Sequence, residues 1–273
     1  SLLETTRSRY NALGQMPGSL FSVLDVSAPS ITIDQAKLSR KMNNLKENLD
    51  NVRARIKAAC DQAARRPEEI RILAVSKLHP AERIRSLYGL GQRAFGENYA
   101  QEALAKQSRL QDLDIQWHFI GPLQSNKTRE VAAHFDWVQS ADRQKILRRL
   151  SEQRPGALPP LNVCIQVNID REPQKAGVLP EAAGELAGMI IDLPGLRLRG
   201  LMAIPRMGDE EYDPGDSYQR MHELFLSLQA AGLGMDTLSM GMSADLEQAI
   251  LHGSTMVRIG TDLFGPRPGD DRA

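Results

Sequence analysis

Cysteine is scarce in this chain. Among its 273 residues there are two cysteines, Cys60 and Cys164, and they form no CxxC motif. This excludes a disulfide framework and a cysteine-based zinc site, and it is typical of proteins from a reducing cytosol. The five histidines also lack the spacing of metal ligands. We therefore expect a cytoplasmic protein that holds no metal ion.

Long apolar runs and an excess of charge of one sign are also missing. No segment approaches the roughly 18 apolar residues that a membrane span needs. The first residues lack the basic-then-apolar pattern of a signal peptide. Lysine and arginine number 34, and aspartate and glutamate also number 34. This balance gives no electrostatic reason to expect nucleic acid or an anionic membrane as a partner.

What the chain does contain is a regular alternation of two hydrophobic periods. Eight short apolar runs lie at 70–76, 93–97, 115–120, 136–139, 161–169, 196–204, 237–241 and 255–260. Amphipathic stretches of helical length lie between them, for example 81–90, 127–135, 143–153, 181–191, 218–231 and 245–252. Buried strands that alternate with helices predict a parallel sheet covered on both faces, and eight strands predict closure into a barrel. The predicted fold class is therefore α/β, a single (β/α)8 TIM-type barrel.

A long helix is predicted from about Asp34 to Ala64, before the first strand. Its apolar positions alternate four and three residues apart, at Leu38, Met42, Leu45, Leu49, Val52, Ile56 and Ala59. Such a heptad stripe is typical of a coiled coil and also of a helix that packs on its own domain. Only seven predicted helices follow strands, which leaves one place vacant in the outer ring. We therefore expect a monomer whose added N-terminal helix fills that place.

The domain organisation follows from these patterns. With 41% hydrophobic residues the chain can bury one sizeable core. Residues 1–33 show no sustained period, and we expect them to be a poorly ordered or expression-derived extension. Residues 34–267 are predicted to form the barrel, and residues 268–273 a tail.

Polar residues gather at the predicted carboxyl ends of the strands, where barrels of this type carry their active sites. Lys77 follows the first strand, and Glu97 and Asn98 follow the second. Small residues occur after the last two strands, in MGMS at 240–243 and RIGT at 258–261. A recurrent phosphate site lies at these two loops, because a phosphate needs close backbone approach and hydroxyl or amide donors. The alternative is ordinary loop chemistry, with Lys77 as a solvated strand end.

A lysine in a barrel mouth across from a phosphate site indicates one kind of ligand. A partly buried lysine whose pKa is lowered from about 10.4 can form a Schiff base with an aldehyde. An aldehyde with a phosphate tail is pyridoxal 5′-phosphate (PLP). Arg258, inside the eighth strand, could point at the ring nitrogen of this cofactor. It would keep that nitrogen unprotonated, because two cations repel, whereas an acidic partner favours the electron-sink form of many PLP enzymes.

Six motifs in order resemble those of one family. They read LAVSK, GQRAFGENYAQE, WHFIGPLQSNK, VNID with QKAG, LRLRGLMAIP, and LSMGMSADLEQAI with GSTMVRIGTDLFGPR. Over roughly residues 35 to 267 the chain resembles the pyridoxal phosphate homeostasis proteins, which are similar to the barrel domain of alanine racemase, fold type III among PLP proteins. The resemblance implies a protein that binds PLP and buffers or delivers it, with apo PLP enzymes as recipients and no catalytic turnover.

The resemblance also implies roles for single residues. Lys77 matches the lysine that forms the internal aldimine, Asn98 a residue near the cofactor ring, and Arg258 the arginine that faces the pyridine nitrogen. The expected phosphate ligands are Ser243, Gly260 and Thr261, with the Met242 backbone beside them. One departure is Leu78, which stands where many members have a small polar residue.

A PLP-dependent amino-acid racemase or decarboxylase is the alternative function. Racemisation by two bases needs a second base on the face opposite the lysine. In the racemases a separate β domain after the barrel brings a tyrosine to the partner subunit's site. We expect that domain to be absent, because few residues follow the eighth strand. Tyr99 is the nearest tyrosine in the sequence that could substitute for it.

A third function is that of a barrel enzyme that acts on a phosphorylated metabolite, with Lys77 forming a Schiff base to the substrate, as in aldolases. A PLP absorbance band in the purified protein would separate it from the first two functions. If Lys77 does not carry the cofactor, Lys127 and Lys175 are the next candidates, because each follows a strand end.

Overall fold

The computed structural model describes residues 35–206 and 213–265, with side chains from residue 44 onward. The predicted extension 1–33 and the predicted tail 268–273 lie outside the described residues. The side chains of Leu38 and Met42, the first two of the predicted heptad stripe, also lie outside them.

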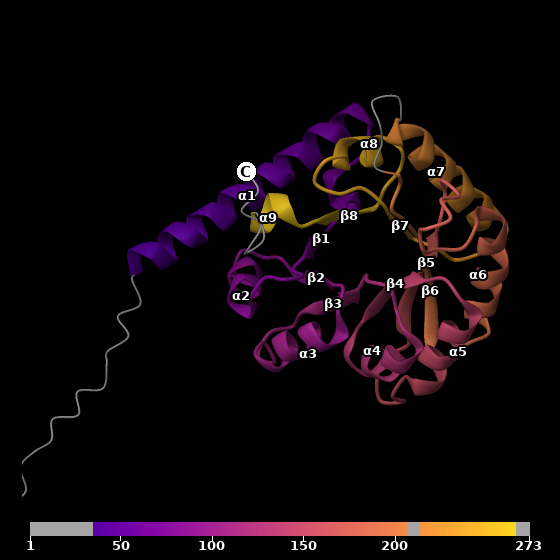
Figure 1. Cartoon of the computed structure of the whole chain (residues 1–273). Coiled ribbons are helices and arrows are strands. Elements are labelled where there is room, and N and C mark those ends of the chain that lie inside the picture. Colours follow the sequence, from indigo (N-terminus) through magenta and orange to yellow (C-terminus); the bar gives the residue numbers. More distant parts are fainter. Residues whose placement is uncertain (1–34, 207–212, 266–273) are drawn as a thin grey trace, which may run out of the picture. The chain divides into compact units, whose positions relative to one another are not determined.

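In the described part of the chain, eight parallel strands close into one barrel in chain order, and β1 pairs with β8 (Figure 1). The strands are β1 (Arg71–Val75), β2 (Ala94–Glu97), β3 (Gln116–Phe119), β4 (Trp137–Ala141), β5 (Leu161–Val167), β6 (Leu196–Ala203), β7 (Thr237–Ser239) and β8 (Met256–Ile259). Each strand overlaps its predicted run, because strands that are buried on both faces appear in the sequence as nearly continuous apolar stretches. The predicted (β/α)8 barrel is confirmed.

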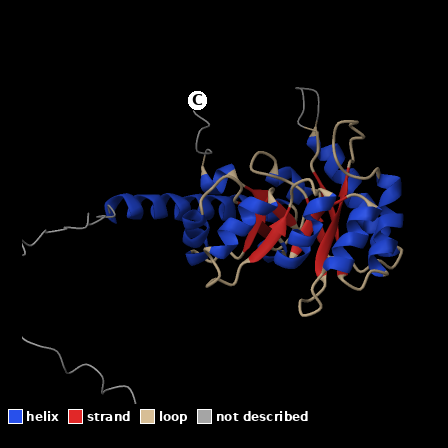
Figure 2. Cartoon of the chain, turned by 60° about the horizontal axis from the view of Figure 1, so that its bottom comes forward, coloured by secondary structure: helices blue, strands red, loops and turns tan. Residues whose placement is uncertain are grey.

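Helices surround the strands on the outside of the barrel (Figure 2). They are α2 (Ala81–Gly89), α3 (Ala100–Ser108), α4 (Thr128–His134), α5 (Gln144–Gln153), α6 (Ala183–Ile191), α7 (Pro214–Ala230), α8 (Leu246–Leu251) and α9 (Thr261–Phe264), with 3-10 turns η1 (Pro67–Glu69), η2 (Ser125–Lys127) and η3 (Pro180–Ala182). α7 begins earlier than predicted. Proline suits the first turn of a helix, and the Asp213 side chain accepts a hydrogen bond from the Gly215 N–H at 2.8 Å. No described helix combines the length and the apolar composition of a membrane span.

The core has an outer part, between strands and helices, and an inner part within the barrel. In β5 the side chains alternate between the two, since Val163 and Ile165 belong to the outer cluster and Cys164 packs with Trp137 inside. The guanidinium groups of Arg71 and Arg199 lie 5.3 and 4.4 Å from the centroid of the Trp137 ring. Side chains therefore fill the barrel interior, and a ligand site is confined to the mouth.

α1 (Gln35–Gln62) fills the outer place beside β8 and β1, which the four-residue α9 is too short to cover. Its Asn48 Nδ2 donates to the Leu263 carbonyl at 2.9 Å, so α1 lies against α9 (Figure 1). The described stripe side chains are at most 4% exposed and belong to the outer core; they are Leu45, Leu49, Val52, Ile56 and Ala59. The helix therefore packs on its own barrel, as predicted.

Candidate functional site

Lys77 lies in a tight turn directly after β1. The Ser76 carbonyl accepts a hydrogen bond from the His79 N–H at 3.0 Å, so Lys77 and Leu78 occupy the two central positions of the turn. Leu78 has φ = 65°, in the left-handed region that residues other than glycine rarely adopt. Lys77 itself is half-buried. The turn thus determines the direction in which the Lys77 side chain leaves the end of β1.

Asn98 follows β2 and the fully buried Glu97. Its Oδ1 atom is buried and has no hydrogen-bond partner among the described residues. Gly121, in the turn after β3, lies so close that a Cβ at this position would collide with the Asn98 carbonyl oxygen. A buried acceptor without a donor is costly, so the Asn98 Oδ1 atom is an unused acceptor beside the end of β2.

Arg258 in β8 is a buried cation, 5% exposed, whose guanidinium reaches the ends of two other strands. Nη1 donates to the carbonyl and the Oγ of Ser239 at 2.7 and 3.0 Å, and Nη2 donates to the Ala203 carbonyl at 2.8 Å. These bonds use three of the five N–H donors of the group. Burial lowers the pKa of Arg258, but arginine stays charged in proteins. Arg258 is thus a fixed cation whose bonds to Ser239 and Ala203 leave further N–H donors.

A hydrogen-bond chain inside the barrel holds Ser239 in place. Ser239 Oγ donates to Gln139 Oε1 at 2.7 Å, Gln139 Nε2 lies 2.9 Å from His118 Nδ1, and His118 Nε2 lies 3.0 Å from Gln116 Oε1. Burial lowers the pKa of His118 well below its ordinary value, so the imidazole is neutral. A neutral ring that accepts at Nδ1 donates at Nε2, which fits both neighbours.

The loops after β7 and β8 lie against each other. The Asp262 N–H points at Ser243 Oγ, 3.4 Å away. Ser243 is half-buried and Thr261 is exposed. The Met242 N–H donates to Asp245 Oδ1 at 2.6 Å, so this amide already has an acceptor within its own loop. Among the four expected phosphate ligands, the Met242 N–H is therefore already bonded to another described residue.

Arg55 of α1 joins these two loops from outside, and it is not among the predicted site residues. Its Nε and Nη2 donate to Glu247 at 2.6 and 2.8 Å, Nη1 donates to Asp262 at 2.5 Å, and Nη2 also donates to the Ser243 carbonyl at 2.9 Å. The hydrogen bonds to Glu247 raise the pKa of Arg55. No local pattern could have identified Arg55, because its partners lie 188 to 207 residues away in the sequence.

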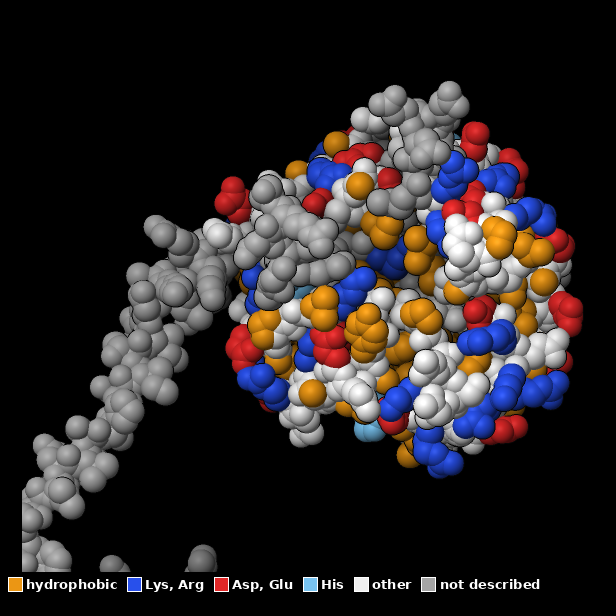
Figure 3. Space-filling model, viewed as in Figure 1, with side chains coloured by type: hydrophobic (Ala, Val, Ile, Leu, Met, Phe, Trp, Pro, Cys, Tyr) orange, Lys and Arg blue, Asp and Glu red, His pale blue; other side chains and the backbone are white. Residues whose placement is uncertain are grey.

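Strand order brings the predicted residues to one end of the barrel. In the pairing of β1 with β8, Leu73 lies opposite Arg258. Gly260 follows β8 beside Val75, whose carbonyl oxygen is 3.6 Å from where a Cβ of Gly260 would lie. Figure 3 shows a hollow near the centre of this face, with basic side chains among hydrophobic ones. All the predicted site residues lie in or directly after four neighbouring strands, β7, β8, β1 and β2; they are Met242, Ser243, Arg258, Gly260, Thr261, Lys77 and Asn98.

Lys106 of α3 is a buried cation that bonds the carbonyl of Ser76, the residue before Lys77, and it is not among the predicted site residues. It is 6% exposed, and its Nζ lies 2.7 Å from both Glu97 Oε1 and Glu102 Oε1. Burial raises the pKa of Glu97, and the Lys106 charge opposes this shift. A signal was present, because position 106 lies three residues after Ala103 on the buried side of α3, where a lysine is unusual.

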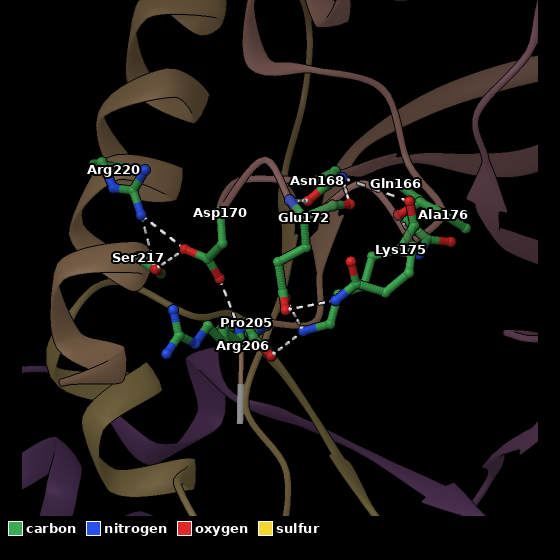
Figure 4. A network of polar contacts seen from close by, with 11 residues as sticks. Gln166, Asn168, Asp170, Glu172, Lys175, Ala176, Pro205, Arg206, Ser217 and Arg220 are labelled. Atoms are coloured by element: carbon green, nitrogen blue, oxygen red, sulfur yellow. Dashed lines mark hydrogen bonds and ion pairs between the residues drawn. The ribbon is translucent and has the colours of Figure 1, made fainter. Parts of the chain in front are cut away.

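The two alternative lysines, Lys127 and Lys175, have ion-pair partners. Lys127 Nζ lies 3.2 Å from Glu130. Lys175 Nζ lies 2.5 Å from Glu172 and donates to the Pro205 carbonyl at 3.0 Å (Figure 4). The contacts of Lys175 therefore hold the loop after β5 against the end of β6.

Comparisons with known proteins agree on one group. The family model for the alanine racemase N-terminal domain matches residues 45–268. The pyridoxal phosphate homeostasis protein of Pseudomonas aeruginosa is 55% identical over 226 residues, which cover 83% of this chain and 97% of that protein. The protein of the same name from Escherichia coli K12 is 51% identical over 229 residues, which cover 83% of this chain and 98% of that protein.

Solved structures give the same picture. PipY of Synechococcus elongatus, determined with PLP bound, has a TM-score of 0.71 and 37% identity, covering 81% of this chain and all of that one. Alanine racemase of Clostridium difficile has a TM-score of 0.65 and 16% identity, covering 84% of this chain and 58% of that one. The second likeness concerns the fold alone.

Proposed function

Because the chain belongs to the pyridoxal phosphate homeostasis protein family, we propose that it binds PLP covalently through Lys77 and buffers or delivers this cofactor. The observation that carries the proposal is the convergence at one barrel mouth of Lys77, the buried Arg258 and the paired loops after β7 and β8. We further propose that the protein works in the cytoplasm, with apo PLP enzymes as recipients.

The residues at the mouth fit this cofactor chemically. Arg258 has donors left for a ring nitrogen that is unprotonated and therefore an acceptor. The buried Oδ1 of Asn98 needs a donor, which a hydroxyl on the ring supplies. The hydroxyls of Ser243 and Thr261 and the small Gly260 suit a phosphate group. Each polar feature of the ligand thus has a counterpart of the opposite hydrogen-bonding kind.

Each residue has a separate task in this proposal. PLP supplies an aldehyde carbon that bonds reversibly to an amine. Lys77 Nζ would supply the amine that bonds to this carbon. Arg258 orients the ring and keeps its nitrogen unprotonated. Ser243, Gly260 and Thr261 hold the phosphate, and Arg55 keeps their two loops together.

We propose a carrier without catalytic turnover rather than a racemase or decarboxylase. A cation at the ring nitrogen disfavours the electron-sink form on which most PLP-dependent enzymes rely. Racemisation also needs a second base held opposite Lys77. Tyr99, the nearest candidate by sequence, is 59% exposed, which does not favour a fixed position. Incubation of the PLP-loaded protein with single enantiomers of amino acids tests the enzymatic alternative, and a growing signal of the opposite enantiomer would establish it.

The test of the proposed function is an absorbance spectrum of the purified protein, with and without borohydride, followed by peptide mass mapping. We expect the visible band of a PLP Schiff base, and after reduction a pyridoxyl group on Lys77. The Lys77→Ala variant should lose the band. A Lys77→Ala protein that keeps the full band at stoichiometric loading would move the attachment to Lys127 or Lys175. A wild-type protein without the band would instead favour an enzyme that acts on a phosphorylated metabolite.

A further inference from the structure

We propose that Lys106 is a positioning residue for Lys77, which it controls through the backbone of the turn after β1. This inference rests on the proposed function, because it concerns the lysine that carries the cofactor. Lys106 is buried, belongs to another element, α3, and has no place among the expected ligands.

The ammonium group of Lys106 is fully used by oxygens around the turn. Nζ donates to the Ser76 carbonyl at 2.8 Å and to Glu97 Oε1 at 2.7 Å, and it lies 2.7 Å from Glu102 Oε1. Three acceptors match the three N–H donors of an ammonium. Lys106 therefore connects three segments, which are the residue after β1, the end of β2 and its own helix.

The pair Lys106 and Glu102 bonds the peptide groups on both sides of Lys77. On one side, Lys106 donates to the carbonyl of Ser76. On the other side, the N–H of Leu78 donates to Glu102 Oε1 at 2.6 Å. The two peptide groups that flank Lys77 are thus hydrogen-bonded to the two members of one ion pair, Lys106 and Glu102.

The turn needs such support because Leu78 is strained. Its φ of 65° falls at the turn position where glycine is the usual residue, since a Cβ disfavours that conformation. A residue in a sparsely populated region persists only when the surrounding structure holds it there. In the described structure, the ion pair on α3 supplies this support, because it is hydrogen-bonded to the Ser76 carbonyl and to the Leu78 N–H.

A purely structural role for Lys106 is the competing explanation. A buried ion pair is weak evidence for stability, because well-packed apolar residues often replace one without loss. The neighbours of Lys106 on the buried side of α3 are Ala100 and Ala103, so an apolar residue would suit the helix. An apolar residue, however, could not donate to the Ser76 carbonyl. It also could not neutralise Glu102, which accepts from the Leu78 N–H.

The experiment compares PLP titration and the rate of borohydride-fixed pyridoxylation of Lys77 in the full chain and its variants. We expect Lys106→Met to weaken PLP binding by about 10- to 150-fold, the range for losing a hydrogen bond with a charged partner. In the apo proteins, the rate at which an amine-reactive reagent labels Lys77, read by peptide mass, should change as well. Arg154→Met is the matched control, because Arg154 also donates to several carbonyls but lies after α5 at the other end of the barrel. We expect it to retain wild-type affinity.

A double variant distinguishes a role of Lys106 in positioning Lys77 from a role in the stability of the fold alone. Glycine at position 78 keeps the turn geometry without support, so Lys106→Met combined with Leu78→Gly should recover most of the lost affinity. Glu102→Ala, whose side chain is already 24% exposed, provides a second variant if Lys106→Met does not fold. We expect it to weaken binding in the same direction.

Wild-type PLP affinity and Lys77 labelling in a folded Lys106→Met or Glu102→Ala protein would overturn the inference. So would a loss of PLP affinity in Arg154→Met equal to that in Lys106→Met. A double variant that binds PLP as weakly as Lys106→Met alone would overturn it as well. A wild-type protein that binds no PLP is a different failure, because it contradicts the proposed function itself.

Discussion

The hydrogen-bonding groups at the barrel mouth differ in how strongly they are already bonded to other protein groups. The Met242 N–H is bonded to Asp245, whereas the contact that Ser243 Oγ accepts from Asp262 is long, at 3.4 Å. A hydroxyl can also donate while it accepts. At the scale of single residues, Ser243 is therefore the side chain on which binding of the phosphate should depend most.

Ser243→Ala should weaken PLP binding by about 10- to 150-fold, the cost of losing one hydrogen bond to a charged group. Titration of the apo protein by absorbance measures this. Ser227→Ala is the matched control, because its hydroxyl donates to the Leu224 carbonyl on the exposed side of α7. Unchanged affinity in Ser243→Ala would remove this residue from the site.

The thiol of Cys164 is kept in its protonated form by burial. Its pKa is raised to about 12 by burial, while a thiol in an unfolded chain titrates near its ordinary value of about 8.5. Between these values the unfolded chain loses a proton that the folded chain keeps. Raising the pH through this window therefore favours unfolding, and the stability that the neutral thiol contributes is present in full only below it.

We therefore compare the free energies of unfolding of the wild type and of Cys164→Ala. The wild-type value minus the variant value should fall as the pH rises from about 8.5 toward 12. Urea denaturation of both proteins at several pH values measures this difference, and other titrating groups largely cancel in it. A difference that stays constant over the window would contradict the buried, neutral thiol.

At the scale of elements, α1 has two functions on two parts of its surface. Its apolar stripe covers the barrel, and Arg55 reaches the loops that carry Ser243 and Asp262. The heptad spacing identified the stripe, because local period reflects burial. The same spacing could not identify Arg55, since its task depends on which distant loops lie beside the helix.

Arg55→Met should weaken PLP binding several-fold, because the loops after β7 and β8 lose the group that joins them. Arg53→Met is the control, since Arg53 lies on the exposed face of the same helix. PLP titration and thermal unfolding of both variants provide the comparison. Equal affinities in the two variants would show that the loops keep their geometry without Arg55.

Leu45→Glu should unfold the protein, because it places a charge where a leucine is 2% exposed. Removal of the leucine contacts alone costs about 2–5 kcal/mol, a large part of the stability of a typical domain. Circular dichroism against temperature measures the outcome, with Asn44→Glu at an exposed neighbouring position as the control. A folded Leu45→Glu protein of lower mass than the wild type would instead indicate a coiled-coil interface.

At the scale of the whole molecule, closure of the barrel decides where the apolar surfaces go. Strand pairing runs around the full ring, and α1 covers the strands where the chain would otherwise leave an apolar groove. The described part of the stripe is used within one chain. A partner chain is therefore not needed to bury it.

The protein is expected to be a monomer, and sedimentation equilibrium at low micromolar concentration tests this. The mass of one chain, independent of concentration, is the expected result. A dimer that persists at this concentration, and that Leu45→Glu separates without unfolding, would overturn it.

The sequence by itself determined the alternation of strands and helices, the closed barrel, the packing stripe of α1 and the candidate residues at the strand ends. Those features follow from hydrophobic period and residue type, which are local properties of the chain. Only the tertiary structure decided which polar groups meet. The strained turn at Leu78, the ion pair of Lys106 with Glu97, the engaged N–H of Met242 and the bridge from Arg55 to Asp262 all depend on the angle and register at which elements pack. Hydrogen bonds require atoms to be placed to within a few tenths of an ångström, and no periodicity in a sequence carries information of that kind.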